Sequence, residues 1–209
     1  MIKKNFLFKL LFIMLLIIIF SSCQEKSTTG SDNVEYTTKW KEDGSGNIQF
    51  YCDNPKLKGF KFYKITENIY NTTTIEVELT RVSGNENKGQ GIVFCFLDSN
   101  NFYSVLILNN QKYAILKKIN GNYFLIREWT YCADLNPGYD VVNTILIDFD
   151  HTAHTIDISF NGQPALTQAT DDSFTEGKVG FYAAVDSQDR LPGIPVDLRF
   201  KMNQPEALP

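Results

Sequence analysis

The sequence lacks a hydrophobic segment long enough to cross a membrane as a helix. Its N-terminal apolar stretch, residues 10–20, has 11 uncharged residues, whereas a helix needs about 20 apolar residues to span the hydrocarbon core. Lys3, Lys4 and Lys9 precede this stretch and small residues follow it, which is the arrangement of a secretory signal peptide. Residues 1–22 are therefore predicted to direct export and to be removed.

The residues around the expected cleavage site, Phe20-Ser21-Ser22-Cys23, resemble the lipobox of bacterial lipoproteins. The alternative is an ordinary signal peptide followed by an unrelated cysteine. In a lipoprotein, Cys23 becomes the first mature residue and carries acyl chains, and each buried methylene contributes about 0.8 kcal/mol to anchoring. The resemblance implies lipidation at Cys23 and a protein held on a membrane of the cell envelope, facing the periplasm or the exterior.

The sequence also has few basic residues and no cluster of them. The chain has 20 Lys and Arg against 24 Asp and Glu, and removal of residues 1–22 leaves 17 against 24, a net charge of −7. Binding to nucleic acid, or to anionic lipid through the protein itself, requires clustered positive charge. Nucleic acid is therefore excluded as a partner, and membrane attachment is expected through lipid alone.

No segment after Cys23 has a sustained helical period, which argues against helices. Residues 23–36 are mostly small and polar, so they are predicted to form a flexible tether. Residues 37–202 are expected to be one domain, and residues 203–209 a loose tail.

Short runs rich in Ile, Val, Phe, Tyr and Thr alternate with Gly, Asn, Asp and Pro throughout residues 37–202. A dozen such runs predict an all-β, two-sheet antiparallel sandwich. Asn161-Gly162 and Asn120-Gly121 are predicted to be type I′ hairpin turns. The expected strands are 47–52, 60–66, 73–82, 92–98, 103–109, 113–119, 123–131, 143–149, 155–160, 163–168, 177–185 and 195–202.

Four segments in order resemble the concanavalin A-like lectin/glucanase jelly roll, and in particular LamG-like and keto-disaccharide hydrolase-like domains. They are residues 98–103 (DSNNFY), 143–148 (NTILID), 160–162 (FNG) and 174–182 (FTEGKVGFY). The resemblance covers about residues 45–202 and implies the fold rather than an activity. Gly177 and Gly180 are read as positions where backbones approach closely.

Glucanases of this fold carry acids close to the pattern E-x-D-x-x-E on one strand, because retaining chemistry needs two carboxyl groups about 5 Å apart. Glu76-Val77-Glu78 has the alternation but neither the aspartate nor the third acid, so it is read as a solvated strand face. A Gly-x-Ser-x-Gly motif is also absent. No catalytic residue is assigned, and an activity like that of the keto-disaccharide hydrolases stays an alternative.

No metal or cofactor is expected. The only histidines, His151 and His154, fall with Asp148 and Asp150 at an expected hairpin tip, where polar residues are common and rigid ligand sets are not. The acids of residues 186–190 (DSQDR) suggest calcium, but their ligand pattern is incomplete. Residues 71–73 (NTT) match a glycosylation sequon, which has little weight in a bacterial lipoprotein.

Three cysteines remain after lipidation of Cys23, so at least one is unpaired. Cys95 lies in the apolar run of residues 92–97 and is expected to be a buried thiol. Cys52 and Cys132 each end a predicted strand and could form a disulfide in an oxidising compartment, but sequence cannot show whether they are close enough.

The expected strand 123–131 places Tyr123, Arg127, Trp129 and Tyr131 on one side if its side chains alternate. Sugar rings stack on aromatic faces, and their hydroxyls accept hydrogen bonds from a guanidinium. These four residues are therefore the candidate ligand-binding set, and the alternative is that they pack against a neighbouring element. Phe124 and Ile126, on the other side, are expected to face the core.

Three functions are consistent with this sequence. A lectin-like module would bind a glycan or another surface ligand, such as a protein, without turnover. A hydrolase would instead show two acids facing each other on the concave sheet face. A structural envelope protein, the third possibility, would show neither feature.

Overall fold

The computed structural model describes residues 37–54, 57, 61–70, 73–185 and 194–203. The chain divides into residues 1–35 and a second unit, Tyr36–Pro209, and all described residues belong to the second. They form thirteen β-strands and no helix, so none of them belongs to a helix that could cross a membrane. The predicted signal peptide, Cys23 and almost all of the predicted tether and tail lie outside the described residues.

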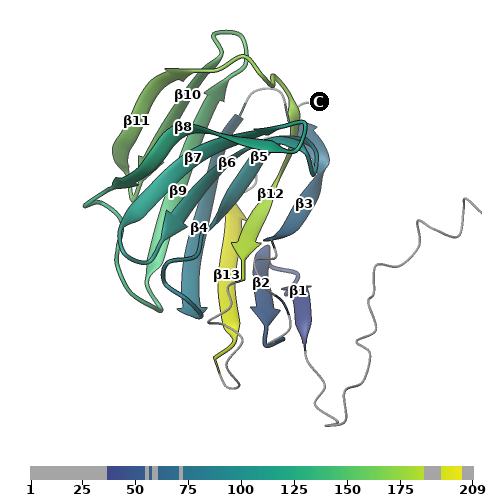
Figure 1. Ribbon diagram of the computed structural model, residues 1–209, viewed down its shortest axis with the longest axis vertical. Coiled ribbons are helices and arrows are strands. Elements are labelled where there is room, and N and C mark those ends of the chain that lie inside the picture. Colours follow the sequence, from purple (N-terminus) through teal and green to yellow (C-terminus); the bar gives the residue numbers. More distant parts are fainter. Residues whose placement is uncertain (1–36, 55–56, 58–60, 71–72, 186–193, 204–209) are drawn as a thin grey trace, which may run out of the picture. The chain divides into compact units, whose positions relative to one another are not determined.

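The strands form two antiparallel sheets (Figure 1), which confirms the predicted sandwich. The seven-stranded sheet has the order β1-β2-β13-β4-β9-β10-β11, with β1 at Thr38–Glu42, β2 at Asn47–Cys52, β13 at Val196–Asn203, β4 at Thr73–Ser83, β9 at Val142–Asp150, β10 at Thr155–Phe160 and β11 at Gln163–Thr170. The six-stranded sheet has the order β3-β12-β5-β6-β7-β8, with β3 at Lys61–Tyr70, β12 at Gly177–Ala184, β5 at Gln90–Asp98, β6 at Asn101–Leu108, β7 at Lys112–Ile119 and β8 at Asn122–Tyr131.

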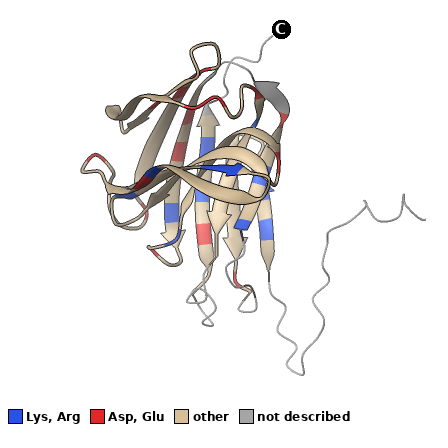
Figure 2. Ribbon diagram, turned by 45° about the horizontal axis from the view of Figure 1, so that its top comes forward, with Lys and Arg blue, Asp and Glu red and all other residues tan. Residues whose placement is uncertain are grey.

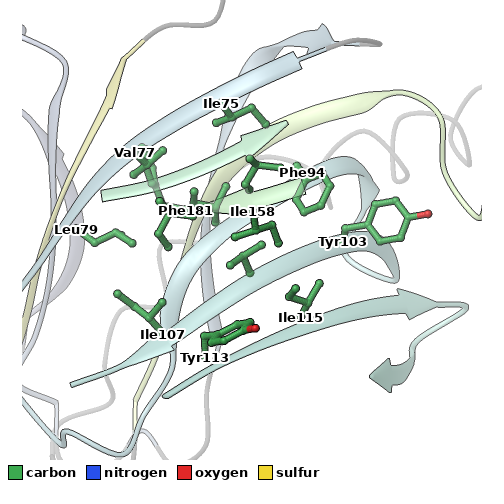
Figure 3. Close-up of a cluster of buried hydrophobic side chains, with 14 of the residues drawn as sticks. Ile75, Val77, Leu79, Phe94, Tyr103, Ile107, Tyr113, Ile115, Ile158 and Phe181 are labelled. Atoms are coloured by element: carbon green, nitrogen blue, oxygen red, sulfur yellow. The ribbon is translucent and has the colours of Figure 1, made fainter. Parts of the chain in front are cut away.

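One large hydrophobic core lies between the two sheets. Along β4, alternate residues Ile75, Val77 and Leu79 are buried, because side chains of a strand point to opposite faces in turn. They belong to the same cluster as Phe94 of β5 and Phe181 of β12 in the other sheet (Figure 3). Full burial of each such side chain contributes about 1.5–3 kcal/mol, so this core is the main source of stability.

The two predicted hairpin turns are present. Asn161 and Gly162 have φ angles of 50° and 81°, and Asn120 and Gly121 have 49° and 83°, as a type I′ turn requires. The flanking residues pair directly, Phe160 with Gln163 and Ile119 with Asn122. Asn161 also links the turn to the sandwich, because its Oδ1 accepts a hydrogen bond of 2.8 Å from the backbone N–H of Thr144.

One strand was not predicted. β1 (TKWKE) has three charged residues among five and lies at an edge of the seven-stranded sheet. It pairs with β2 along its whole length and contacts the core through Trp40, whose ring centroid lies 4.9 Å from that of Phe50 and 5.6 Å from that of Phe200. A single aromatic residue therefore joins this polar strand to the core.

Candidate functional site: the concave face of the six-stranded sheet

The outer face of the six-stranded sheet is concave. β3 and β8 are the two edges of this sheet, yet the hydroxyl oxygens of Tyr63 on β3 and Tyr123 on β8 lie 3.4 Å apart. The ammonium of Lys61 on β3 also lies 3.8 Å from the centroid of the Tyr123 ring. Strands in a flat sheet are about 4.8 Å apart, so residues at opposite edges meet only when the sheet curves toward the face that carries them.

Aromatic side chains line this concave face. A second hydrophobic cluster, separate from the main core, contains Phe102 of β6 and Tyr182 of β12, with Tyr63 and Phe96 packed against it. The Tyr63 ring centroid is 5.5 Å from those of both Phe102 and Tyr182, with the rings edge to face, the arrangement that the charge distribution of aromatic rings favours. Phe102 and Tyr182 are 0% and 5% exposed, so they form a buried aromatic base beneath the side chains that meet on the concave face.

Two lysines meet this aromatic base at Tyr123. The Lys118 ammonium lies 5.1 Å from the Tyr123 centroid and donates a 2.7 Å hydrogen bond to the carbonyl oxygen of Ser99. Burial alone would raise the pKa of the Tyr123 phenol, but hydrogen bonds from Lys61 and Tyr63 and the nearby ammonium charges lower it below its ordinary value. Burial and the bond to Tyr123 raise the pKa of Tyr63. These directions favour Tyr63 as the donor.

The predicted ligand-binding residues lie on β8, at the edge of the sheet. Tyr123, Trp129 and Tyr131 are 40%, 44% and 63% exposed. Tyr123 and Tyr131 lie opposite Lys118 and Lys112 of β7, and directly opposed residues share a face. Because Lys118 contacts the concave aromatic residues, these tyrosines are on the concave face.

Arg127 does not share that face. Two register shifts interrupt the pairing of β7 with β8, and Arg127 lies opposite Ile115, a residue of the main core. The expectation that four residues share one side assumed unbroken alternation, and the extra residues of a bulge break it. Trp129 follows the tyrosines, because its neighbour Thr130 lies opposite the core residue Tyr113. The binding role of all four residues stays a prediction.

The two side chains of β8 expected to face the core differ. Ile126 packs against the main core, as expected, whereas Phe124 is 48% exposed. β8 as a whole therefore holds an unusual share of exposed apolar surface, with Leu125 also 52% exposed. Leu125 lies opposite Leu116, on the same side as Tyr123, and exposed apolar side chains grouped on one face are typical of binding surfaces.

The sequence did not identify Tyr63, Phe102, Tyr182 and the two lysines as site residues. A signal was present, because β5 and β6 read as nearly continuous apolar runs rather than alternating ones. Such runs indicate burial on both faces of a strand. What could not be read was that residues far apart in the sequence, Lys61 and Tyr123, meet across the curved sheet.

The acids considered for hydrolysis lie on the other sheet. Glu76 and Glu78 alternate with the buried Ile75, Val77 and Leu79 on β4, so they point away from the core. The Glu78 carboxylate lies 3.6 Å from the Lys201 ammonium of β13. Glu76 and Glu78 therefore lie on an outward strand face of the seven-stranded sheet, as expected for a solvated face.

At the turn between β9 and β10, which carries His151 and His154, the Asp150 carboxylate forms hydrogen bonds within the turn itself. Asp150 accepts hydrogen bonds of 2.8 and 2.9 Å from the backbone N–H groups of Thr152 and Ala153, which lower its pKa. Within the described ranges, no three residues of the metal-ligating types gather in one place. The possible calcium segment 186–190 and Asn71-Thr72 of the sequon lie outside those ranges.

Cys52, Cys95 and Cys132 are buried, and Cys52 and Cys132 do not form with each other the disulfide that was considered. The Cys52 sulfur lies 3.3 Å from the hydroxyl oxygen of Thr38. Burial raises the pKa of the Cys95 thiol to about 12, as expected for a residue within the hydrophobic core.

The sequence matches no family model and no curated protein, but solved structures share its fold. A CBM66 carbohydrate binding module from Bacillus subtilis has a TM-score of 0.59 at 15% identity, over 79% of this chain and 89% of that one. The Emp46p carbohydrate recognition domain has a TM-score of 0.52 at 12% identity, over 80% and 86%. A Bacillus licheniformis β-glucanase has a TM-score of 0.51 at 14% identity, over 84% and 88%. The chain therefore has the concanavalin A-like jelly-roll fold that the four sequence segments predicted.

Proposed function

We propose that this protein is a lipid-anchored, glycan-binding module that displays its jelly-roll domain from the cell envelope. The observation that carries the proposal is the concave face, where an aromatic base with polar groups at its rim lies beside the exposed Trp129 and Tyr131. Sugar rings present apolar C–H faces to aromatic rings and hydroxyls to polar groups. The similar carbohydrate binding module and carbohydrate recognition domain support the proposal through their fold.

In this proposal the lipid is attached to Cys23, the residue that follows the predicted signal peptide. The tether of residues 23–36 then separates the domain from the membrane, facing the periplasm or the exterior. The net charge of −7 after removal of residues 1–22 gives the protein itself little attraction for an anionic bilayer. Attachment in this proposal is therefore a property of the acyl chains alone.

Binding without turnover is favoured over hydrolysis, although the similar β-glucanase keeps hydrolysis as the second candidate. A retaining glycosidase needs two carboxyl groups about 5 Å apart across the sugar. The acid pair considered for catalysis, Glu76 and Glu78, lies on the seven-stranded sheet, and the Glu78 carboxylate pairs with the Lys201 ammonium. The residues that meet on the concave face are instead tyrosines, phenylalanines and lysines.

A glycan array probed with the full-length protein in nonionic detergent tests this function. We expect retention on a subset of glycans, and Trp129→Ala should weaken that binding by about 1–3 kcal/mol. Because Trp129 is 44% exposed, the melting temperature of the Trp129→Ala variant should stay within a few degrees of that of the wild type. An array without binding would contradict the proposal, and release of new reducing ends from a bound glycan would favour the hydrolase.

The second tryptophan provides a matched control. Trp40 is partly buried and packs on Phe50 and Phe200, so Trp40→Ala should cost about 1–3 kcal/mol of stability without changing the affinity of the folded protein. Trp40→Phe leaves Trp129 as the only tryptophan of the chain. In that variant, a bound glycan should change the tryptophan fluorescence, which locates the ligand at β8.

A further inference from the structure

The β7–β8 hairpin is basic in an acidic protein. Residues 112–131 contain Lys112, Lys117, Lys118 and Arg127 against a single acid, Glu128, whereas the whole chain has a net charge of −4. Among the described residues, every basic side chain except Lys88 lies on a strand, and Figure 2 shows the basic residues along the strand ribbons. The positive charge of this hairpin is therefore presented on sheet surface.

Two of these lysines stand at the two ends of the exposed aromatic row. On the concave face of the hairpin, Lys118 lies opposite Tyr123, Leu116 opposite Leu125, and Lys112 opposite Tyr131. Six residues of extended strand span about 20 Å, so Lys112 and Lys118 are separated by about that length. Trp129 and Leu125 lie on β8 between them, both with substantial exposed surface.

The lysines of the concave face differ from Lys117 in their ion pairing. Lys117, on the core side, forms an ion pair with Asp171. In the part of the chain that the structure describes, no carboxylate forms a salt bridge with Lys61, Lys112 or Lys118. Asp98 accepts hydrogen bonds from the backbone N–H of Asn100 at 2.6 Å and from the Asn101 amide, and these bonds lower the pKa of its carboxyl group. The charge of Lys118 lowers the same pKa further.

The backbone of β8 is poorly suited to an added strand. β8 is an edge of the six-stranded sheet, but two register shifts interrupt it near Arg127 and Leu125. Bulges of this kind disturb the regular row of free N–H and C=O groups that a β-strand partner would use. The exposed surface is thus matched to a ligand that binds through side chains rather than through backbone pairing.

We propose that this hairpin binds an acidic glycan, a chain of uronate sugars, along the row from Tyr123 to Tyr131. The sugar rings lie on Trp129, Tyr131 and Leu125, and the carboxylates meet the ammonium groups of Lys112 and Lys118. This inference rests on the proposed glycan-binding function and names its ligand class. Lys61 adds a third positive charge next to Tyr123.

The geometry favours a uronate over a neutral sugar. A uronate carboxylate is bonded directly to a ring carbon, so it stays close to the plane of a ring that stacks on an aromatic side chain. The Lys118 ammonium lies 5.1 Å from an aromatic centroid, within reach of such a carboxylate. A neutral sugar would leave the three ammonium groups without a counter-ion and would gain nothing from their charge.

Binding of oligogalacturonate and of its fully methyl-esterified form to the full-length protein in nonionic detergent tests the inference. The two ligands share one backbone, and the carboxylates of the first are replaced by uncharged methyl esters in the second. We expect oligogalacturonate to bind at least tenfold more tightly, with an affinity that falls as salt rises. The double variant Lys112→Gln/Lys118→Gln should reduce oligogalacturonate affinity about tenfold, a much larger loss than for the uncharged ester.

A control with the same change in net charge is Lys39→Gln/Lys41→Gln on β1, in the other sheet, which should bind as wild type does. Equal affinity for both ligands, or equal loss in both double variants, would overturn the uronate assignment and leave glycan binding standing. Binding to sulfated dextran but not to oligogalacturonate, or to vesicles of anionic lipid alone, would also overturn it. Binding to no glycan at all would overturn both proposals.

Discussion

Asp171 is a partly buried carboxylate that accepts hydrogen bonds from other elements of the sandwich and from its own loop. Its carboxylate lies 2.5 Å from the Lys117 ammonium and accepts a 2.7 Å hydrogen bond from the Tyr103 hydroxyl. The Tyr103 oxygen in turn accepts a 3.1 Å bond from the backbone N–H of Phe174. Asp171 thus attaches the loop between β11 and β12 to β6 and β7 of the six-stranded sheet.

This contact makes acid stability depend on Asp171. Burial alone would raise its pKa, but hydrogen bonds from Lys117, Ser173 and Tyr103 outweigh burial and lower the pKa to about 2, from 3.8. Because the pKa is depressed in the folded state, the stabilisation is fully present above pH 3.8 and is lost as the pH falls toward 2. Asp171→Asn should cost about 1–3 kcal/mol at pH 7, measured by urea unfolding, and should unfold with a weaker acid dependence than wild type.

The neighbouring Asp172 is exposed and provides the control, because Asp172→Asn should leave both the stability at pH 7 and the acid limb unchanged. An acid limb of equal steepness in Asp171→Asn and wild type would show that other groups control acid unfolding. The sequence could not predict this network, since Asp171 lies 54 and 68 positions from its partners Lys117 and Tyr103. The Asn161 turn could be predicted, because its chemistry is local.

At the scale of the strand, the pattern of apolar residues predicted most elements well. β2 and β10 begin and end at the predicted residues, because turn residues bound them on both sides. β1 was missed because Thr38–Glu42 is mostly polar, pairs with β2 at the edge of the sheet and packs against the core through Trp40. The bulges of β8 were also missed, since an extra residue in one strand is defined only by its pairing with another. Arg127 was placed on the wrong face for this reason.

Gly177, at the start of β12, shows how closely two strands of the six-stranded sheet approach. It has a φ of +151°, and a Cβ atom added there would lie 2.4 Å from the carbonyl carbon of Cys95 and 2.6 Å from the backbone nitrogen of Phe96. Cys95 itself has a φ of 47°, and the β5–β6 and β5–β12 registers both shift near it. The close approach that the sequence suggested for Gly177 is therefore present, and the same holds for Gly180, whose added Cβ would lie 2.4 Å from the carbonyl oxygen of Lys64.

Gly177→Ala should destabilise the domain by about 2–3 kcal/mol, because backbone atoms rather than a flexible side chain would have to move. The free energy of unfolding in urea measures this cost. Gly44 is the comparison, since it also has a positive φ, 77°, but has no atom within 4 Å of an added Cβ. Gly44→Ala should cost only about 1 kcal/mol of backbone strain, and equal costs at both glycines would contradict a steric origin at Gly177.

At the scale of the whole molecule, composition and pattern were sufficient for the sandwich but not for its site. The main core requires only that apolar residues alternate along each strand, as Ile75, Val77 and Leu79 do. The concave face requires in addition that the sheet curves until Tyr63 and Tyr123 meet, and curvature is a collective property of six strands. The strand that carries the exposed aromatic residues could therefore be predicted from the sequence, whereas the concave face to which it belongs could not.

The link between this domain and a membrane is predicted to be a single thioether at Cys23. Lipid transfer to a lipoprotein needs a thiol at that position, so Cys23→Ser should abolish incorporation of radiolabelled palmitate and shift the protein from the membrane to the soluble fraction. Cys132→Ser is the matched control, because Cys132 is a buried free thiol in the sandwich and its variant should label as wild type does. The far-UV circular dichroism of Cys23→Ser should remain that of a β protein, since the described strands of the two sheets lie between Thr38 and Asn203. Equal labelling of Cys23→Ser and wild type would show that residues 20–23 are not a lipobox, and the protein would then reach its ligand without a lipid anchor at this cysteine.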